Sequence, residues 1–130
     1  MDQKSHHINL GNNAESIAEK FLKDRRFVIL ERNWRWKKAE IDLIALDGKD
    51  LVMIEVKGRS SEKYGKATGF VSDKKILFLQ EAGAMYASQI DHHWSIRIDL
   101  IGVYFKSKNG HTIHHITDVG YEGFTVVLVF

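Results

Sequence analysis

Three charged side chains interrupt two apolar runs near the middle of this 130-residue chain. The runs cover residues 40–46 and 51–57, and the sequence Asp47-Gly48-Lys49-Asp50 separates them. That pattern predicts a β-hairpin. A loop of Gly48-Lys49 and a longer loop from Asp47 to Asp50 give the same register, so both place residue 42 directly opposite residue 55. The charged residues are Asp42, Glu55 and Lys57.

Two carboxylates that face each other among apolar neighbours require a cation. Directly paired residues have Cβ atoms about 5 Å apart, and like charges there are destabilising. Mg²⁺ takes carboxylate oxygens and keeps several waters. Lys57 lies two residues beyond Glu55 on the same side, where its ammonium could hold a water or a phosphate oxygen. The arrangement suits phosphodiester hydrolysis, although a surface hairpin with a solvated polar face has the same residue pattern.

The flanking sequence predicts an α/β domain that holds this hairpin. Residues 1–10 are polar, and we predict a flexible tail there and a single domain over residues 11–130. Apolar spacing predicts helices, and alternation predicts strands. In order, we expect a helix from a cap at Asn12 or Asn13 to about Arg26, a strand from Phe27 leading through Lys38 into the hairpin, a helix from Ser72 or Asp73 to about Ser88, and strands over 94–105 and 112–117.

Basic residues surround the hairpin and indicate contact with nucleic acid. Arginine, lysine and tryptophan alternate over residues 33–38, which suits phosphate contact and base stacking, as well as an amphipathic strand with its aromatics inside. The polar loop after the hairpin and the first turn of the second helix add further lysines. The helix dipole does not favour cations there, but the free N–H groups of a helix start bind phosphate. The candidate contacts are Arg35, Lys38, Arg59, Lys63, Lys66, Lys74 and Lys75.

Composition narrows the classes of protein further. The chain has no cysteine, so disulfides and thiolate metal sites are excluded and an intracellular location is favoured. No apolar run approaches the roughly 20 residues that span a bilayer, so we expect a cytoplasmic protein without a membrane partner. The net charge of +2 permits nucleic-acid binding without requiring it. The apolar end of the chain, residues 123–130, should pack on the sheet or pair across a dimer interface.

Several short motifs occur together in this chain: Leu10 to Ala18, Arg32 to Arg35, Ala39 to Ala45 and Glu55 to Arg59, with later matches at Tyr64-Gly65, Lys75 and Arg97-Ile98-Asp99. These motifs resemble those of the YraN-like family of uncharacterised bacterial proteins. The resemblance covers about residues 10–117. Two departures are Ala14 and Ala39, where the family usually has glycine, and neither removes a metal ligand.

That family in turn resembles archaeal Holliday junction resolvases and the restriction-endonuclease-like superfamily. The resemblance implies the element order αβββαββ and a central mixed sheet flanked by helices. It implies catalytic residues Glu15, Asp42, Glu55 and Lys57. Asp42, Glu55 and the backbone carbonyl of Val56 would hold Mg²⁺ or Mn²⁺, with Glu15 bound directly or through a water. It also implies a homodimer, because a four-way junction needs two symmetric cuts.

The residues of the first helix leave two interpretations of Glu15 open. A glutamate in a first turn is favoured by the helix dipole alone. Alternatively, its carboxylate reaches toward the acids on the hairpin. Together, the motifs predict a metal-dependent endonuclease acting on DNA, including branched or junction DNA. The alternatives are a non-catalytic nucleic-acid-binding module that keeps the nuclease fold, and an assembly subunit.

Overall fold

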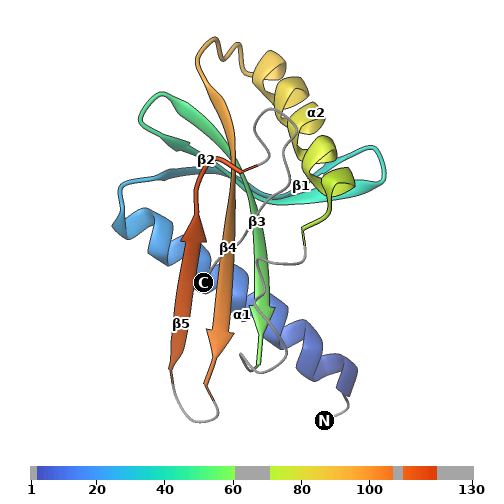
Figure 1. Ribbon diagram of the computed structural model, residues 1–130, viewed down its shortest axis with the longest axis vertical. Helices are drawn as coiled ribbons and strands as arrows, with labels where there is room; N and C mark the ends of the chain where they lie inside the picture. Colours follow the sequence, from blue (N-terminus) through green and yellow to red (C-terminus); the bar gives the residue numbers. More distant parts are fainter. Residues whose placement is uncertain (1–2, 61–70, 107–109, 120–130) are drawn as a thin grey trace.

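One mixed sheet forms the centre of the protein in the computed structural model, which describes residues 3–60, 71–106 and 110–119 (Figure 1). The sheet has the strand order β1-β2-β3-β4-β5. All neighbouring strands are antiparallel except β3 and β4, which are parallel. A parallel pair needs a crossover connection, and α2 lies within it. The elements are α1 (Gln3–Asp24), β1 (Val28–Trp36), β2 (Ala39–Asp47), β3 (Asp50–Arg59), α2 (Asp73–Gln89), β4 (Ile96–Phe105) and β5 (His111–Ile116).

The two helices cover opposite faces of the sheet (Figure 1). Ala14, Ala18 and Leu22 of α1 pack against Val52 and Ile54 in one apolar layer. The α2 helix packs its own buried residues against the other face. Alternation along β3 therefore sends successive side chains into two different cores. This explains why both runs of the hairpin are apolar throughout, as in a strand buried on both faces.

Close packing fixes the position of α2 on the sheet. A Cβ atom added to Gly83 would lie 3.0 Å from Met53 Cγ and 3.2 Å from Ile96 Cγ2. The helix begins after Ser72, whose side chain accepts a hydrogen bond from Lys75 N. This confirms one of the two predicted caps, and it fixes which residues form the first turn of α2.

The start of α1 differs from the sequence prediction. The helix begins at Gln3, so the predicted cap at Asn12 or Asn13 is wrong. Glycine and asparagine are weak helix formers, but such propensities are small enough for the surrounding helix to override them. The predicted mobility of residues 1–10 stays a prediction. Within the described parts of the chain, no helix has the length and apolar character needed to cross a membrane.

Candidate functional site

The hairpin of β2 and β3 has the predicted register. Its pairs run from Asp47 with Asp50 to Leu43 with Ile54, and the next position of the same register places Asp42 opposite Glu55. The backbone ladder stops at this position. Here Asp42 Oδ2 accepts a hydrogen bond from Val56 N at 2.7 Å, so the side chain of Asp42, rather than a backbone carbonyl, holds the two strands together. We call Asp42 and Glu55 the acid pair.

A second interruption lies beside the first, between β1 and β2. The pairs Arg32 with Leu43 and Trp34 with Ile41 flank it, so Asn33 occupies the position opposite Asp42. Asn33 has a φ of 50°, in the left-handed region that asparagine tolerates better than most residues. The interruptions therefore align Asn33, Asp42 and Glu55 in a polar row across three strands.

Asn33 connects this row to the first helix. Its Nδ2 donates a hydrogen bond to Glu15 Oε1 at 3.0 Å. The side chain of Glu15 thus reaches toward the sheet, as the second interpretation of the sequence expects. A cavity of about 220 Å³ lies beside the contact. Its lining residues are Glu15, Ser16, Glu19, Arg32, Asn33 and Leu43.

The acid pair is electrostatically unfavourable when both of its carboxyl groups are ionised. Burial, together with a hydrogen bond and repulsion from Glu55, raises the pKa of Asp42 to about 8. The negative charge of Glu15 adds to this effect, and the hydrogen bond from Val56 N opposes it. Two carboxylates this close favour a state in which one holds a proton. A cation that binds both would remove the need for that proton.

A lysine from α2 contacts the acid pair. Lys75 Nζ lies 3.0 Å from Glu55 Oε2 and donates to the backbone carbonyl of Glu40 at 3.4 Å. The sequence predicted Lys75 only as a nucleic-acid contact. Lys57, the predicted cation of the site, is partly exposed, and no hydrogen bond or ion pair joins its side chain to another described residue. The structure therefore shows Lys75, and not Lys57, in contact with Glu55.

The fit of these residues to a divalent cation rests on the acid pair. Within residues 3–60, 71–106 and 110–119, no three side chains of His, Cys, Asp or Glu form a group that could hold a metal ion. Glu55 is only 5% exposed, and its Oε2 atom receives no well-directed hydrogen bond, although the lysine ammonium is near. Two carboxylates with water in the remaining positions suit Mg²⁺. Glu15 Oε1 accepts a hydrogen bond from Asn33, and the role of Glu15 toward a metal stays a prediction.

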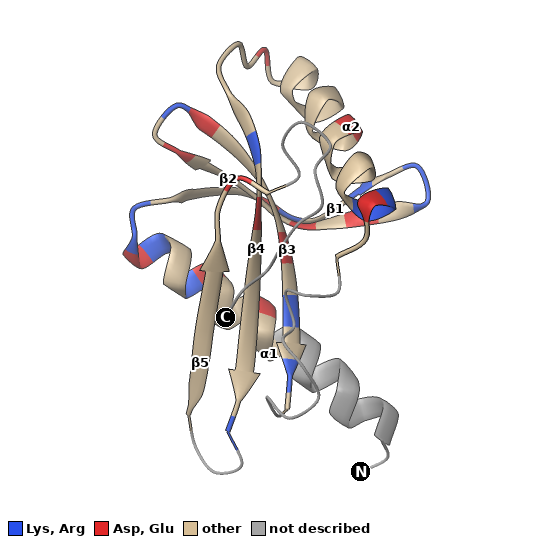
Figure 2. Ribbon diagram, viewed as in Figure 1, with Lys and Arg blue, Asp and Glu red and all other residues tan. Residues whose placement is uncertain are grey.

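The predicted nucleic-acid contacts do not all lie together. Figure 2 shows that the turn between β1 and β2, which carries Lys38, lies beside the first turn of α2, which carries Lys74. A ring contact between Trp36 and Phe78, with centroids 5.8 Å apart, joins these two elements. Arg35 is paired with Glu40 at 2.6 Å. Arg59 is the last residue of β3. The predicted contacts Lys63 and Lys66 lie outside the described residues.

A separate network of charged residues occupies the other end of the hairpin. Asp99 is fully buried and accepts hydrogen bonds from Arg97 at 3.0 Å and from His115 at 2.8 Å. Burial alone would raise the pKa of Asp99, but hydrogen bonds from His115 and Arg97 lower it. Arg97 also contacts Asp47 at 2.8 Å and Asp50 at 2.9 Å. The network therefore joins the hairpin turn to β4 and β5.

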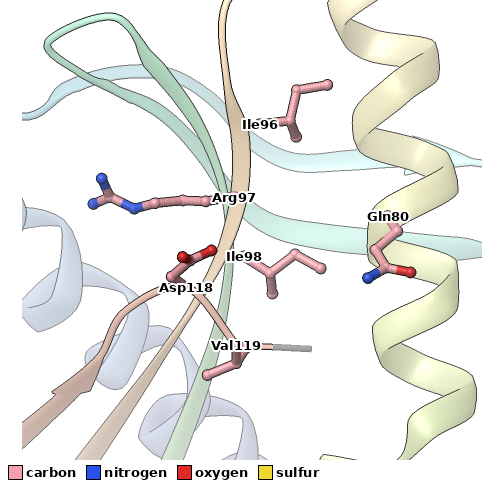
Figure 3. Close-up of a pocket in the computed structure, with 6 residues that line it drawn as sticks. All are labelled: Gln80, Ile96, Arg97, Ile98, Asp118 and Val119. Carbon is pink, nitrogen blue, oxygen red and sulfur yellow. The ribbon is translucent and has the colours of Figure 1, made fainter. Parts of the chain in front are cut away.

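A cavity of about 170 Å³ lies on the α2 side of this network. Figure 3 shows that Ile98 and Gln80 face each other across it, whereas Arg97 extends to the opposite side of β4. The other lining residues are Ile96, Asp118 and Val119. None of the lining residues belongs to the polar row, so this cavity is distinct from the candidate site.

Sequence reasoning missed two residues of the site. Asn33 gave no signal except its place in an Arg-Asn-Trp-Arg motif, since its left-handed conformation and its partner Glu15 depend on the fold. Lys75 gave a partial signal, because a cation in a first helical turn is unfavourable. That signal points to a compensating anion, here Glu55, as readily as to a phosphate.

Comparison with known proteins shows that the chain is similar to the members of one family. The model of the family described as "Uncharacterised protein family UPF0102" matches residues 14–103. A UPF0102 protein of Flavobacterium psychrophilum is 40% identical over 89% of this chain and 97% of its own length. A UPF0102 protein of Hahella chejuensis is 42% identical over 79% of this chain and 84% of its own length. A UPF0102 protein of Christiangramia forsetii is 38% identical over 86% of this chain and 93% of its own length. Their names state no activity.

Proposed function

The chain belongs to the uncharacterised protein family UPF0102, and from that premise we propose that it is a metal-dependent endonuclease that hydrolyses phosphodiester bonds in DNA. The observation that carries the proposal is the acid pair, in which the half-buried carboxylate of Asp42 faces the buried carboxylate of Glu55 where the sheet is interrupted. A structural role alone does not account for them, because facing carboxylates destabilise a sheet. A carboxyl group with a pKa raised as strongly as that of Asp42 is characteristic of functional sites.

The arrangement of elements supports a restriction-endonuclease-like fold within this proposal. The order αβββαββ and the mixed sheet with a helix on each face agree with the expectation from the resemblance. The acidic residue on the first helix, Glu15, faces the strands that carry Asp42 and Glu55. Fold analogy is a weak argument for function, so the proposal rests on the acid pair.

Each residue of the site has a defined part in the proposed reaction. Asp42, Glu55 and the carbonyl of Val56 would hold Mg²⁺ or Mn²⁺, which supplies Lewis-acid stabilisation of the phosphoryl group when bound. Glu15, fixed by Asn33, would orient a water. Lys57 is partly exposed on the same strand as Glu55 and would donate to a phosphate oxygen, where a cation stabilises the developing charge.

Branched DNA is the proposed substrate, and the proposed active form is a cytoplasmic homodimer. A four-way junction is symmetric, so two copies of one site would cut it at equivalent positions. The basic turn between β1 and β2, next to the first turn of α2, would contact the phosphate backbone. Such contacts make binding fall steeply with salt.

Cleavage of defined DNA substrates tests the proposal. The purified full chain would be incubated with four-way junction, flap and duplex DNA in Mg²⁺, Mn²⁺ or a chelator. We expect metal-dependent cleavage, with a loss of about 100-fold or more in Asp42→Asn and Glu55→Gln. Glu81→Gln is the matched control, because Glu81 is an exposed acid on α2. A folded wild-type protein that neither binds Mn²⁺ nor cuts any of the three substrates would refute the proposal.

One observation favours a second candidate, a nucleic-acid-binding module without catalysis. Lys75 already neutralises Glu55 at 3.0 Å, so the site has a cation without a metal. In that case the wild type would bind junction DNA without cutting it, and Asp42→Asn and Glu55→Gln would bind equally well. The further alternative, an assembly subunit, depends on residues 123–130. These residues lie outside the described part of the chain, so this alternative stays a prediction.

A further inference from the structure

Lys75 occupies an unusual position for a helical lysine. It is the third residue of α2 after the Ser72 cap, where the positive end of the helix dipole disfavours a cation. Its ammonium is nevertheless directed at the sheet, 3.0 Å from Glu55 Oε2 and 5.3 Å from the centre of the Phe78 ring. The contact with Glu55 therefore outweighs the unfavourable dipole.

The burial of the two partners is unequal. The side chain of Glu55 is 6% exposed and that of Lys75 is 32% exposed. Glu55 comes from the rigid centre of the sheet, whereas Lys75 reaches it along a flexible four-carbon stem. If the pair separates, the lysine can move into solvent and the glutamate cannot. Glu55 then needs another cation, because an unpaired buried charge costs several kcal/mol.

We propose that Lys75 is a displaceable counterion of the acid pair. It neutralises Glu55 in the metal-free protein and is released into solvent when a divalent cation binds Asp42 and Glu55. This inference rests on the proposed function, since it requires the acid pair to bind metal. Lys75 and the cation compete for the same carboxylate, so each lowers the affinity of the site for the other. Once released, the ammonium lies at the mouth of the site, beside the proposed DNA contact Lys74.

Metal affinity of two neighbouring variants tests the competition. Binding of Mn²⁺ would be measured by calorimetry on the full chain for the wild type, Lys75→Met and Lys74→Met. Lys74 is the matched control because it is exposed, precedes Lys75 and has no ion pair with a described residue. We expect Lys75→Met to bind Mn²⁺ at least about fivefold more tightly than the wild type. Lys74→Met should stay within about twofold, since exposed charges are screened.

A second measurement, on the wild type, tests the inference even if Lys75→Met does not fold. Acylation of each lysine would be followed by mass spectrometry as Mg²⁺ is added. We expect labelling of Lys75 to rise severalfold at saturation and labelling of Lys74 to stay constant. Unchanged Lys75 labelling, or equal or weaker Mn²⁺ binding by Lys75→Met, would overturn the inference while leaving the metal centre in place. Absence of Mn²⁺ binding in all three proteins would instead overturn the proposed function, and this inference with it.

Discussion

Replacing Asp42 with asparagine should change how stability depends on pH. Burial and the neighbouring Glu55 carboxylate raise the pKa of Asp42 from an ordinary 3.8 to about 8. Between these values the folded protein keeps a proton that the unfolded chain has released. The free energy of unfolding of the metal-free protein therefore falls as pH rises through this window. The stabilisation is complete below pH 4 and is lost by about pH 8.

The size of this effect follows from linkage. The free energy of unfolding can change by at most about 1.4 kcal/mol for each pH unit when one proton is released. Water entry and side-chain relaxation weaken interactions at buried charges, so we expect about half of this maximum, or roughly 2 kcal/mol between pH 5 and pH 8. Asparagine keeps the neutral form at every pH, and its oxygen can still accept the hydrogen bond from Val56 N. Metal-free Asp42→Asn should therefore be more stable than the wild type at pH 8.

Urea denaturation at several pH values measures the difference. Wild type and Asp42→Asn would be unfolded between pH 5 and pH 8 with a chelator present, and their free energies of unfolding compared at each pH. Asp24→Asn is the control, because Asp24 is an exposed acid whose one ion pair among the described residues is with Lys20. Parallel pH profiles for wild type and Asp42→Asn would refute the reasoning, since they would show that Asp42 has no special protonation in the folded protein.

Three further predictions concern other parts of the site and its support. Saturation with Mg²⁺ at about 100 times Kd should raise the free energy of unfolding of the wild type by about 2.7 kcal/mol in urea titrations; an equal gain in Glu55→Gln would show that the cation binds elsewhere. Asn33→Ala and Asn33→Gly both lose the hydrogen bond to Glu15, so both should cut DNA more slowly in the cleavage assay. Asn33→Gly should be about 1 kcal/mol more stable in urea than Asn33→Ala, because glycine adopts the positive φ without strain; wild-type cleavage rates in both variants would contradict a role for Asn33. Asp99→Asn should lower the free energy of unfolding by about 1–3 kcal/mol, because it removes the buried anion that accepts from Arg97 and His115 while Arg97 keeps Asp47 and Asp50; a loss well below about 1 kcal/mol would show that the network contributes little.

The sequence predicted the centre of the protein well because the information there is local. The turn at residues 47–50 and the two apolar runs determine one register, and that register is observed. The position of Asp42 opposite Glu55 follows from it without any knowledge of the rest of the chain. Alternation along the strand expected over residues 94–105 likewise puts Arg97 and Asp99 on one face, where they form an ion pair at 3.0 Å.

Features that depend on distant segments were missed or misplaced. The partner of Lys75 is 20 residues away in the chain, on another element, and α2 must pack at Gly83 before the two can meet. The conformation of Asn33 depends on the interruption of the sheet, which leaves no mark in a local pattern. The early start of α1 was missed because Asn12 and Asn13 are typical helix caps, whereas the helix begins at Gln3 and continues through both residues; such preferences are only a weak guide.

The register of β2 and β3 also has a consequence for the order of folding events. The hairpin closes around the two residues Gly48 and Lys49, since Asp47 pairs with Asp50. It therefore forms by the most local contacts in the sheet, and such contacts form early. We therefore expect the two carboxylates to meet before α2 brings its lysine to them, because the contact between Lys75 and Glu55 joins residues much farther apart in the chain. During that interval a shared proton or a cation from solution must offset their repulsion. The rate of refolding, and not only the final stability, should then rise with acid or divalent cation.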